Sequence, residues 1–369
     1  MKIGIVTFYY AHNYGAVLQA YALKTYLEKF DNNVRMCPHL NKNITSMYER
    51  QLQCTIPKKF FLNPFKWKLV VKEIKKIKWS KDEWRLRYDK FDDFIKTELL
   101  DKDIILKDPD KFDMLFFGSD QIWEQKLIGN DLFYFGYTDL TDIKIAYAAS
   151  CFTADTYFSD EMIQGIKSFD MISVREEKIA NKISTLTNKH VDTVCDPGFL
   201  LKEEAYYKLT EEENRFGDFV LFYFVAEDYE LSKLVEYFRA KLNKKVIEVH
   251  YYKYREEHED YIIDCGPKKF LTLIRYASFV FTNSFHGASF SIIMKKNFWV
   301  KSNNMRLINL LDKFGLKNRL ITHLEISKKN NLFECIDYNK ISKCYDNFVD
   351  LSKAYINRAL EIMEQYNEG

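Results

Sequence analysis

The stretch IGIVTFYYAHNYGAVLQAYALKTYLEKF, residues 3–30, decides the expected fold. It opens with an apolar run over residues 3–8 and continues through a loop that contains Asn13 and Gly15. Five apolar side chains then recur at the spacing of one helical face: Ala16, Ala20, Leu23, Leu27 and Phe30. Strand, loop and helix in this order predict the start of a βαβ unit. The loop lacks the GxGxxG pattern, so no dinucleotide-binding site is predicted.

The same order recurs along the chain. Apolar runs predict further strands at residues 113–117, 145–150, 171–174, 191–194, 219–225, 245–249, 278–282 and 298–300, with helical segments between them. Such alternation is typical of parallel sheets covered on both faces. The polar segment 210–218 separates two series, which predicts α/β domains over residues 1–212 and 213–369. A last helix, at about 349–366, fits either domain, and packing against the N-terminal domain is one expectation.

Composition excludes several classes of protein. The chain has 369 residues, 47% of them hydrophobic, which is enough for two cores, and its net charge of +2 does not suggest a nucleic-acid partner. The seven cysteines form no CxxC pair, which argues against a disulfide framework and a zinc site and favours a reducing, cytoplasmic compartment. The first apolar run predicts a strand and not a signal peptide. No stretch is apolar enough to span a membrane, so we expect a soluble or at most peripheral protein.

Residues 57–90 differ from the rest. They contain twelve Lys or Arg against four Asp or Glu, interleaved with aromatic residues that include Trp67, Trp79 and Trp84. One interpretation is a helical insertion whose aromatic side chains reach the core. A second is a helix on the anionic inner face of the cell membrane, with the aromatic side chains at the interface. Nucleic-acid binding is a third.

Polar residues that follow strands are the candidates for a site, because ligands of open α/β sheets bind beyond the carboxyl ends of the strands. In FTNSFHGASFSIIM, residues 281–294, polar residues interrupt an apolar run where a strand passes into a helix. His286 is expected near the helix N-terminus, which favours an anion, and Gly287 permits close approach of the backbone. The alternative is structural: Ser284 caps the helix and His286 is packed.

Three other loops have similar alternatives. In GSDQIW, residues 118–123, Asp120 is a candidate general base or ligand of sugar hydroxyls, or else caps a helix while Trp123 enters the core. Arg175 follows the strand 171–174 and suits a phosphate or carboxylate, or else pairs with Glu176, Glu177 or another surface acid. The loop AHNYGA, residues 11–16, is a fourth candidate or an ordinary turn. Asp196 is interpreted as part of an Asx-Pro turn.

Together, the segments NYGAVLQAYAL, GSDQIW, ISVREE, DPGFLL and TNSFHGASFSII, in this order and spacing, resemble the polysaccharide pyruvyl transferase family over about residues 3–325. The resemblance implies two Rossmann-like domains in a GT-B-like arrangement, with the active site in the interdomain cleft. It implies transfer of pyruvate from phosphoenolpyruvate, as a ketal, to a sugar of a cell-surface polysaccharide or its lipid-linked precursor. Phosphoenolpyruvate is then a co-substrate, and neither a cofactor nor a metal is expected.

The resemblance also implies roles for individual residues. Arg175 matches the arginine that contacts the phosphoenolpyruvate anion, His286 the proposed catalytic histidine, and Asp120 lies in the acceptor loop, so His286 and Asp120 are expected to act as acid and base. Where many members carry RxH, this chain has Ser284, and Lys301 or Arg306 is the expected replacement cation. The remaining candidates are Gly287 for the anion and, for the acceptor, Asn13, Tyr14, Gly15, Gln121 and Trp123.

Two other functions stay open from the sequence. The first is a GT-B glycosyltransferase that uses a nucleotide sugar, which the departure at Ser284 favours. The second is a non-catalytic member of a glycan-assembly complex. The sequence specifies neither the acceptor sugar, the ketal position nor the oligomeric state.

Overall fold

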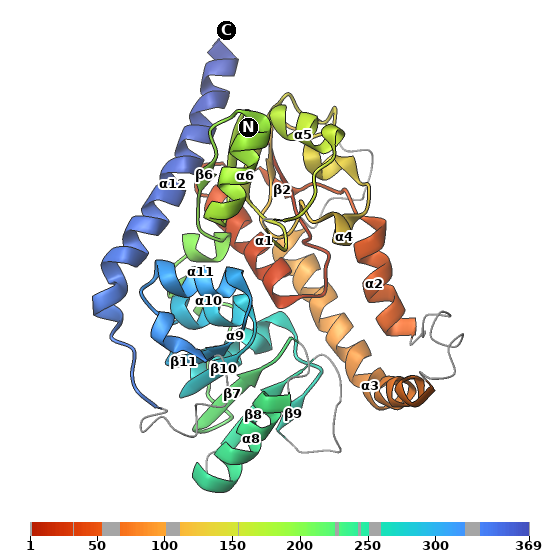
Figure 1. Cartoon of the computed structure of the whole chain (residues 1–369), viewed down its shortest axis with the longest axis vertical. Helices are drawn as coiled ribbons and strands as arrows, with labels where there is room; N and C mark the ends of the chain where they lie inside the picture. The colour runs from red at the N-terminus through yellow and green to blue at the C-terminus, as the bar shows by residue number, and fades with distance from the viewer. Residues whose placement is uncertain are drawn as a thin grey trace. The chain divides into compact units, whose positions relative to one another are not determined.

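The computed structural model describes most of the chain. The described residues are 2–31, 33–53, 67–100, 111–153, 155–225, 229–242, 245–250, 260–321 and 333–368. They fold into two compact units (Figure 1). Unit 1 comprises Met1–Thr45, Phe94–Lys202 and Asn339–Gly369, and unit 2 comprises Ser46–Asp93 and Glu203–Tyr338. Each unit contains a six-stranded sheet in which all pairs are parallel, so the prediction of two α/β units with parallel sheets is confirmed.

The sheet of unit 1 has the strand order β2-β1-β3-β4-β5-β6. Its strands are β1 Ile3–Val6, β2 Val34–Met36, β3 Met114–Phe117, β4 Ile143–Ala149, β5 Met171–Val174 and β6 Asp192–Thr193. The central strands β1 and β3 are buried throughout, because helices cover both faces. Strand β2, which the sequence did not predict, has three residues at one edge and pairs only with β1.

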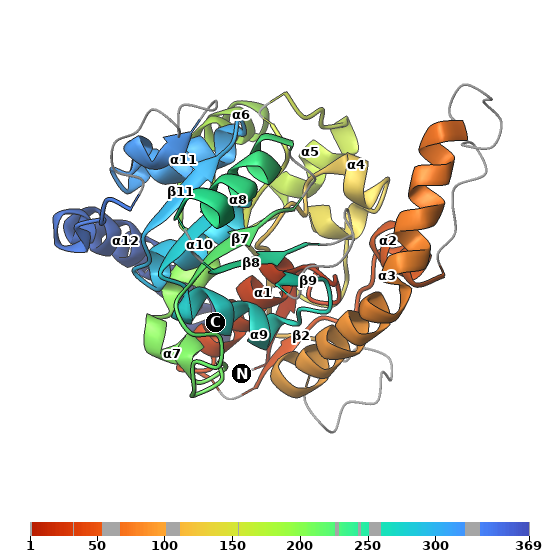
Figure 2. The same ribbon diagram turned by 90° about the horizontal axis from the view of Figure 1, so that it is seen from below.

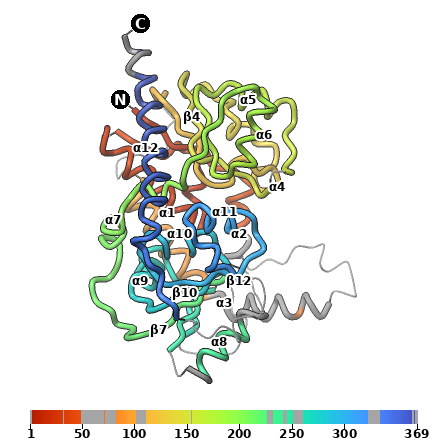
Figure 3. The backbone as a smooth tube through the Cα atoms, turned by 60° about the vertical axis from the view of Figure 1, so that its left-hand side comes forward, coloured from red at the N-terminus to blue at the C-terminus, as the bar shows by residue number. Residues whose placement is uncertain are grey.

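The helices of unit 1 lie on both faces of this sheet. They are α1 Tyr14–Leu27, α4 Gln125–Ile128, α5 Asp160–Lys167, α6 Glu177–Thr187, the short turns η3 Ile95–Leu99, η4 Leu132–Phe135 and η5 Pro197–Leu200, and α12 Tyr338–Glu368. The chain leaves β1 toward β2 and leaves β3 toward β6, in opposite directions, so right-handed crossovers place α1 on the face opposite α5 and α6. Figure 3 shows α5 and α6 on one side of β4 and α12 on the other.

Helix α12 is longer than the sequence predicted. It begins at Tyr338 instead of near residue 349, and the residues from Asn339 onward belong to unit 1. Its buried side chains, Val349, Tyr355, Ile356, Ala359 and Met363, are part of the core. The helix thus contributes to the same unit as the first strand of the chain.

The sheet of unit 2 has the strand order β12-β11-β10-β7-β8-β9. Its strands are β7 Phe219–Tyr223, β8 Lys245–Val249, β9 Tyr261–Ile262, β10 Phe279–Thr282, β11 Phe298–Lys301 and β12 Leu320–Ile321. The four predicted strands of this half all form. The two unpredicted strands, β9 and β12, have two residues each and lie at the edges, where only one neighbour stabilises them.

The helices of unit 2 are α3 Trp67–Phe94, α7 Glu203–Tyr207, α8 Tyr229–Leu242, α9 Pro267–Tyr276, α10 Phe285–Ile293, α11 Met305–Lys313 and the turn η6 Lys317–Arg319, while α2 Lys42–Gln53 spans the boundary between units. Alternate residues of β7 face opposite helices. Phe222 packs against Phe238 of α8, and Tyr223 packs against Phe270 of α9, with ring centres 5.6 and 4.8 Å apart. Figure 2 shows α8 beside β7 and β8.

The basic segment 57–90 is described only in part. Residues 54–66 and, apart from Val71, the side chains of 67–81 lie outside the described residues, so most of the expectation of a membrane-facing surface falls outside them too. In the described part of α3, Trp84 is buried, and Lys90 Nζ donates to the carbonyl of Asp264 at 2.9 Å and to its carboxylate. Among the described helices, none combines the length and apolar character needed to cross a membrane.

Candidate functional site

In both units many of the candidate residues lie in loops at the point where the strand order reverses, whereas Arg175 follows β5. In unit 1 the chain proceeds from β1 to β2 on one side and then from β3 outward on the other, so the reversal lies between β1 and β3. In unit 2 it lies between β7 and β10 by the same reasoning. Open α/β sheets bind ligands beyond the carboxyl ends of the strands at such points. The loops after β1, β3, β7 and β10 are therefore the places to examine.

The loop after β1 is built as a helix cap. Asn13 Oδ1 accepts hydrogen bonds from the backbone N–H groups of Gly15 and Ala16, at 2.9 and 3.4 Å, and so caps α1. Tyr14 is 1% exposed and packs in the core. These contacts are those of an ordinary strand-to-helix turn. Tyr14 and Gly15 are both buried in it.

A buried polar web joins this loop to the one after β3. Gln19 lies in α1. Its Nε2 donates to Thr7 Oγ1 at 2.8 Å, and its Oε1 accepts from the N–H of Ser119 at 3.3 Å. Thr7 Oγ1 in turn donates to the carbonyl of Ser119 at 2.9 Å. The sequence reasoning missed Gln19, although a fully buried amide within an Ala- and Leu-rich helix is a detectable signal.

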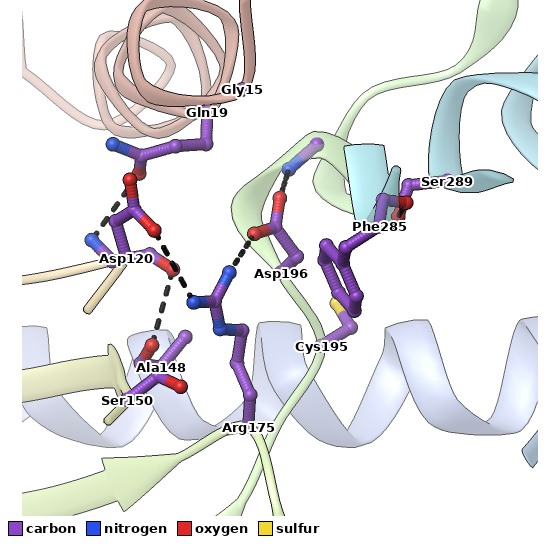
Figure 4. A network of polar contacts seen from close by, with 12 residues as sticks. Gly15, Gln19, Asp120, Ala148, Ser150, Arg175, Cys195, Asp196, Phe285 and Ser289 are labelled. Atoms are coloured by element: carbon purple, nitrogen blue, oxygen red, sulfur yellow. Dashed lines mark hydrogen bonds and ion pairs between the residues drawn. The ribbon is translucent and has the colours of Figure 1, made fainter. Parts of the chain in front are cut away.

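Arg175 and Asp120 meet at the carboxyl edge of unit 1, together with Asp196. Arg175 Nη1 lies 2.7 Å from Asp196 Oδ2, and its Nη2 lies 3.5 Å from Asp120 Oδ1 (Figure 4). The side chain of Arg175 is only 3% exposed, against 14% for Asp120 and 2% for Asp196. One guanidinium is thus held between two carboxylates, and the contact with Asp120 is the longer and more exposed of the two.

An ion pair of Arg175 with an acidic residue was one alternative from the sequence, but the acids in contact with it are Asp120 and Asp196, not Glu176 or Glu177. Glu176, one of the acids considered for a pair with Arg175, accepts a bifurcated hydrogen bond from the Ser150 hydroxyl, with Oγ 2.9 and 3.0 Å from its two carboxylate oxygens. Burial on its own would lower the pKa of Arg175, but the charges of Asp196, Glu176 and Asp120 outweigh it and raise the pKa. The arginine therefore stays charged, and its charge is compensated within unit 1.

The loop after β3 has an unusual backbone. Gly118 has φ of 127° and a Cβ there would lie 2.0 Å from the carbonyl oxygen of Tyr147, so only glycine fits. Asp120 has φ of 77°, which is uncommon for a residue with a side chain. Its carbonyl accepts from the N–H of Ser150 at 3.0 Å, which ties the loop to the end of β4. Asp120 is held in this conformation by the backbone and does not cap a helix.

Gln121 and Trp123, both expected to bind the acceptor, are placed differently. Trp123 is fully buried, its indole N–H donates to the carbonyl of Tyr134 at 3.0 Å, and its ring stacks with Phe135. It is a core residue, as the structural alternative predicted. Gln121 is half-buried, and its Nε2 is buried without a hydrogen-bond partner among the described residues.

In unit 2, Ser284 caps helix α10. Its Oγ accepts from the N–H of Gly287 at 3.2 Å, while its own N–H donates to Thr282 Oγ1 at 3.0 Å. Asn283 Oδ1 accepts from the N–H of Val225 at 2.9 Å, which joins the ends of β10 and β7 across the strand reversal. The polar residues that interrupt the apolar run therefore first serve to end a strand and begin a helix.

Gly287 has a packing role. A Cβ at this position would lie 2.4 Å from Thr282 Oγ1 and 2.9 Å from Tyr223 Cδ1, so glycine lets α10 approach the strands closely. Because its N–H is engaged by Ser284, this group is committed to the cap. An anion that binds the N–H of Gly287, as expected from the sequence, would therefore compete with Ser284 Oγ for it.

Two cations follow strand ends or begin a helix at the same edge as His286. Arg306 Cζ lies 5.1 Å from the ring centre of Phe285, the residue between Ser284 and His286, and the rings of Phe285 and His286 meet edge to face at 5.2 Å. Lys301 ends β11, which pairs with β10 in the register Thr282 to Val300. Arg306 thus lies beside Phe285, the neighbour of His286 in the sequence, and Lys301 ends the strand adjacent to β10.

A second polar cluster of unit 1 was not predicted. Asp131 Oδ2 accepts from His39 Nε2 and from Asn41 Nδ2, both at 2.8 Å, and the His39 ring stacks on Phe133 with centres 3.9 Å apart. Burial on its own would raise the pKa of Asp131, but the hydrogen bonds from His39 and Asn41 outweigh it and lower the pKa. His39 and Asp131 are 92 residues apart, so no local pattern could have paired them.

Comparison with solved structures supports this fold. The chain is similar to a putative UDP-N-acetylglucosamine 2-epimerase from Listeria monocytogenes, with 13% identity, a TM-score of 0.51, and coverage of 100% of this chain and 97% of that one. It is also similar to MnaA of S. aureus in a co-structure with UDP, with 12% identity, a TM-score of 0.51, and coverage of 97% and 95%. At such identities the likeness shows the fold alone, and that fold is GT-B-like, as predicted.

Comparison at the level of sequence families is more specific. A search among curated proteins finds no match to the chain. The family model of polysaccharide pyruvyl transferase matches residues 13–305, a range that contains the loop after β3, Arg175 and the cap of α10. The match covers most of the chain, including both strands at the reversal in unit 2 and β3 at the reversal in unit 1. The chain belongs to the polysaccharide pyruvyl transferase family.

Proposed function

We propose that the protein transfers pyruvate from phosphoenolpyruvate, as a ketal, to two hydroxyls of a sugar in a cell-surface polysaccharide or its lipid-linked precursor. The observation that carries the proposal is the position of Arg306. Its guanidinium lies over Phe285, next to the position where this chain has Ser284 in place of an arginine. In this proposal Arg306 supplies from α11 the cation that is missing at position 284.

The charges at this edge of unit 2 suit an anionic donor molecule. Residues 282–287 and 301–306 contain His286, Lys301 and Arg306 and no acidic residue. Helix α10 also directs its N-terminus, with a partial positive charge, toward the same edge. Phosphoenolpyruvate carries a phosphate and a carboxylate, and both are groups that such an arrangement stabilises.

Arg175 contributes to the proposal through the weaker of its two ion pairs. An incoming carboxylate or phosphate competes for the guanidinium, and Asp120, at 3.5 Å and partly exposed, is easier to displace than Asp196 at 2.7 Å. Displacement leaves Arg175 on the donor molecule and frees the Asp120 carboxylate. Binding of the donor molecule would then activate the base.

The proposed chemistry conserves protons. His286 gives a proton to the methylene carbon of phosphoenolpyruvate, and the first sugar hydroxyl bonds to the carbon that bears the phosphate while Asp120 takes its proton. The bond from that carbon to the phosphate oxygen breaks, and Asp120 returns its proton to the departing phosphate. The second hydroxyl then bonds to the same carbon, and its proton restores His286. The products are the ketal and inorganic phosphate.

For the acceptor sugar we propose Gln121 and Asn13 as ligands. The buried Nε2 of Gln121 is a hydrogen-bond donor without an acceptor among the described residues, and a sugar hydroxyl is a suitable acceptor. Trp123 and Tyr14 support this surface from the core. Phosphoenolpyruvate is the co-substrate in this proposal.

We also propose that residues 57–90 hold the protein at anionic membranes, where lipid-linked acceptors occur. The support is an excess of eight positive charges, twelve basic against four acidic residues. Attraction of about 1 kcal/mol for each basic residue near the surface predicts binding to phosphatidylglycerol vesicles at low salt and release at high salt. Failure to sediment with such vesicles at low salt would reject this part.

The test of the function is a direct assay. The protein is incubated with phosphoenolpyruvate and a panel of lipid-linked and nitrophenyl sugars, and phosphate release is followed together with the mass of each sugar. We expect phosphate release and a sugar whose mass rises by that of a pyruvyl ketal. Transfer of a sugar from UDP-N-acetylglucosamine in parallel reactions, without use of phosphoenolpyruvate, would instead identify a glycosyltransferase.

A further inference from the structure

Helix α12 places two polar side chains against the strands that carry Arg175 and Asp120. Ser352, which is fully buried, accepts through Oγ a hydrogen bond from the N–H of Cys195 at 2.8 Å. Tyr355, also fully buried, donates through its hydroxyl to the carbonyl of Ala146 in β4 at 2.9 Å. In Figure 4 the pale blue-violet helix behind Arg175 and Cys195 is α12. These contacts connect residues 157 and 209 positions apart.

Ser352 holds the backbone N–H of Cys195, the residue that precedes Asp196. Its hydroxyl donates to the carbonyl of Phe348 at 2.8 Å, so its lone pairs are directed toward the N–H of Cys195. The carbonyl of Cys195 accepts from the Tyr147 hydroxyl at 3.2 Å. Both polar groups of Cys195 are therefore engaged, and the backbone that leads into Asp196 is held from two sides.

Asp196 passes this constraint on to Arg175. One carboxylate oxygen accepts from the N–H of Gly198 at 2.9 Å, which orients the carboxylate, and the other pairs with Arg175 at 2.7 Å. The path from α12 to the guanidinium is Ser352, Cys195, Asp196 and Arg175. Each step in it is a hydrogen bond, an ion pair or a covalent bond between buried groups.

Tyr355 reaches Asp120 by a second path. The carbonyl of Ala146 accepts from both Tyr355 and Ser173 Oγ, and Ser173 Oγ accepts from the N–H of Ala148. The carbonyl of Ala148 then accepts from Ser119 Oγ at 3.1 Å, in the residue before Asp120. Burial raises the pKa of Tyr355, so its hydroxyl keeps its proton and remains a donor.

The family match ends at residue 305, so α12 lies outside it, although its side chains support the two residues assigned to anion binding and catalysis. We propose that Ser352 and Tyr355 are positioning residues that set the placement of Arg175 and Asp120. The part that concerns phosphoenolpyruvate rests on the proposed function. A shift of about 1 Å in such groups is enough to reduce binding or catalysis substantially.

The experiment compares Ser352→Ala with a matched control on the same helix. Ser342 is exposed and its Oγ donates to the carbonyl of Asn339, so Ser342→Ala removes the same group without contact to the site. Tyr355→Phe keeps the ring and removes the hydroxyl that donates to the carbonyl of Ala146. Two quantities are measured on full-length protein well below its melting temperature: the Kd for phosphoenolpyruvate by calorimetry, and amide hydrogen exchange of peptides that cover residues 146–149 and 195–198.

We expect Ser352→Ala to weaken phosphoenolpyruvate binding about threefold to tenfold and to raise exchange at residues 195–198 about tenfold, because a buried N–H loses its acceptor. Tyr355→Phe should raise exchange at residues 146–149 and also weaken binding. Ser342→Ala should match the unaltered protein in both measurements. Should Ser352→Ala fail to fold, Tyr355→Phe decides the outcome by the same two measurements.

The outcomes separate this proposal from the proposed function. If the unaltered protein binds phosphoenolpyruvate and both α12 variants bind it equally well, the positioning role is overturned while the function stands. If the unaltered protein does not bind phosphoenolpyruvate, the proposed donor molecule is wrong. Amide hydrogen exchange alone then tests the positioning role. Unchanged exchange at both peptides would then reject the positioning role, and faster exchange confined to them would support it.

Discussion

The carboxyl edges of the two sheets use positive charge in opposite ways. In unit 1 a single buried arginine, Arg175, is shared by two carboxylates. In unit 2, residues 282–287 and 301–306 contain cations and a histidine without an acidic residue, and Arg306 packs over an aromatic ring. A cation that is held between two carboxylates adds little attraction for an anion until one of these partners leaves. An anion that binds Arg175 therefore has to displace a carboxylate in unit 1, whereas the two segments of unit 2 contain no carboxylate of their own to displace.

The largest expected effect concerns His286 in unit 2. If it moves a proton in the transition state, His286→Asn should lower kcat by about 10² to 10⁴ with little change in melting temperature. His190→Asn is the matched control, since His190 is 85% exposed in unit 1. A His286→Asn protein with full activity would show that the histidine is only a packed residue of the turn.

Replacement of Arg175 tests the compensated cation of unit 1. Removing it leaves Asp196 buried without its partner, and such a loss costs about 3–5 kcal/mol, so Arg175→Met should markedly lower the free energy of unfolding in urea. The double variant Arg175→Met, Asp196→Asn should recover part of this loss. Equal stability of the single variant and the unaltered protein would mean that the ion pair contributes nothing to folding.

A smaller effect is expected for Arg306. Loss of one charge-assisted contact should weaken phosphoenolpyruvate binding by roughly 1.5–3 kcal/mol, measured as Kd by calorimetry. Arg306→Ala combined with Ser284→Arg should regain part of the affinity, since it returns a cation to the adjacent position. Arg215→Ala, at an exposed position of unit 2, is the control. No recovery in the double variant would indicate that Arg306 does not substitute for the missing arginine.

The smallest expected effect is on stability at low pH, and it concerns one carboxylate of each unit, Asp131 and Asp264. Burial on its own would raise the pKa of each carboxylate. Hydrogen bonds from His39 and Asn41 outweigh burial and lower the pKa of Asp131 below 3.8. A hydrogen bond from Lys90 and the charge of Lys269 do the same for the pKa of Asp264. A carboxylate whose pKa is lowered on folding contributes stability above its unfolded-state pKa, and this stability is lost as the pH falls through the folded-state pKa.

Unfolding in urea at pH 6 and near pH 3 checks this pair. Asp131→Asn and Asp264→Asn should each cost about 1 kcal/mol or less at pH 6, because solvent screens these half-buried groups, and less still near pH 3. Salt should reduce the effect of Asp264→Asn, whose partners are lysines. A cost that grows as the pH falls would contradict the assigned direction of the pKa shifts.

Local patterns were sufficient for the order of elements and for part of the site. The strand-to-helix transitions at Asn13 and Ser284 were visible in the sequence, because a cap involves residues only two or three positions apart. Strands buried on both faces were visible as apolar runs, whereas β2, β9 and β12 were not. Those strands have only two or three residues, and a single neighbouring strand holds each of them in place.

The sequence by itself determined the α/β class, the family resemblance and the residues that end the strands, because these depend on periodicity and on contacts within one turn. Only the tertiary structure decided what those residues contact. Arg175 pairs with Asp120 and Asp196, which are 55 and 21 positions away, and the backbone before Asp196 depends on Ser352, 157 positions from Cys195. The physical reason is that a buried charge or N–H binds whichever partner the folded sheet and helices bring within about 3 Å, and separation along the chain does not specify that partner.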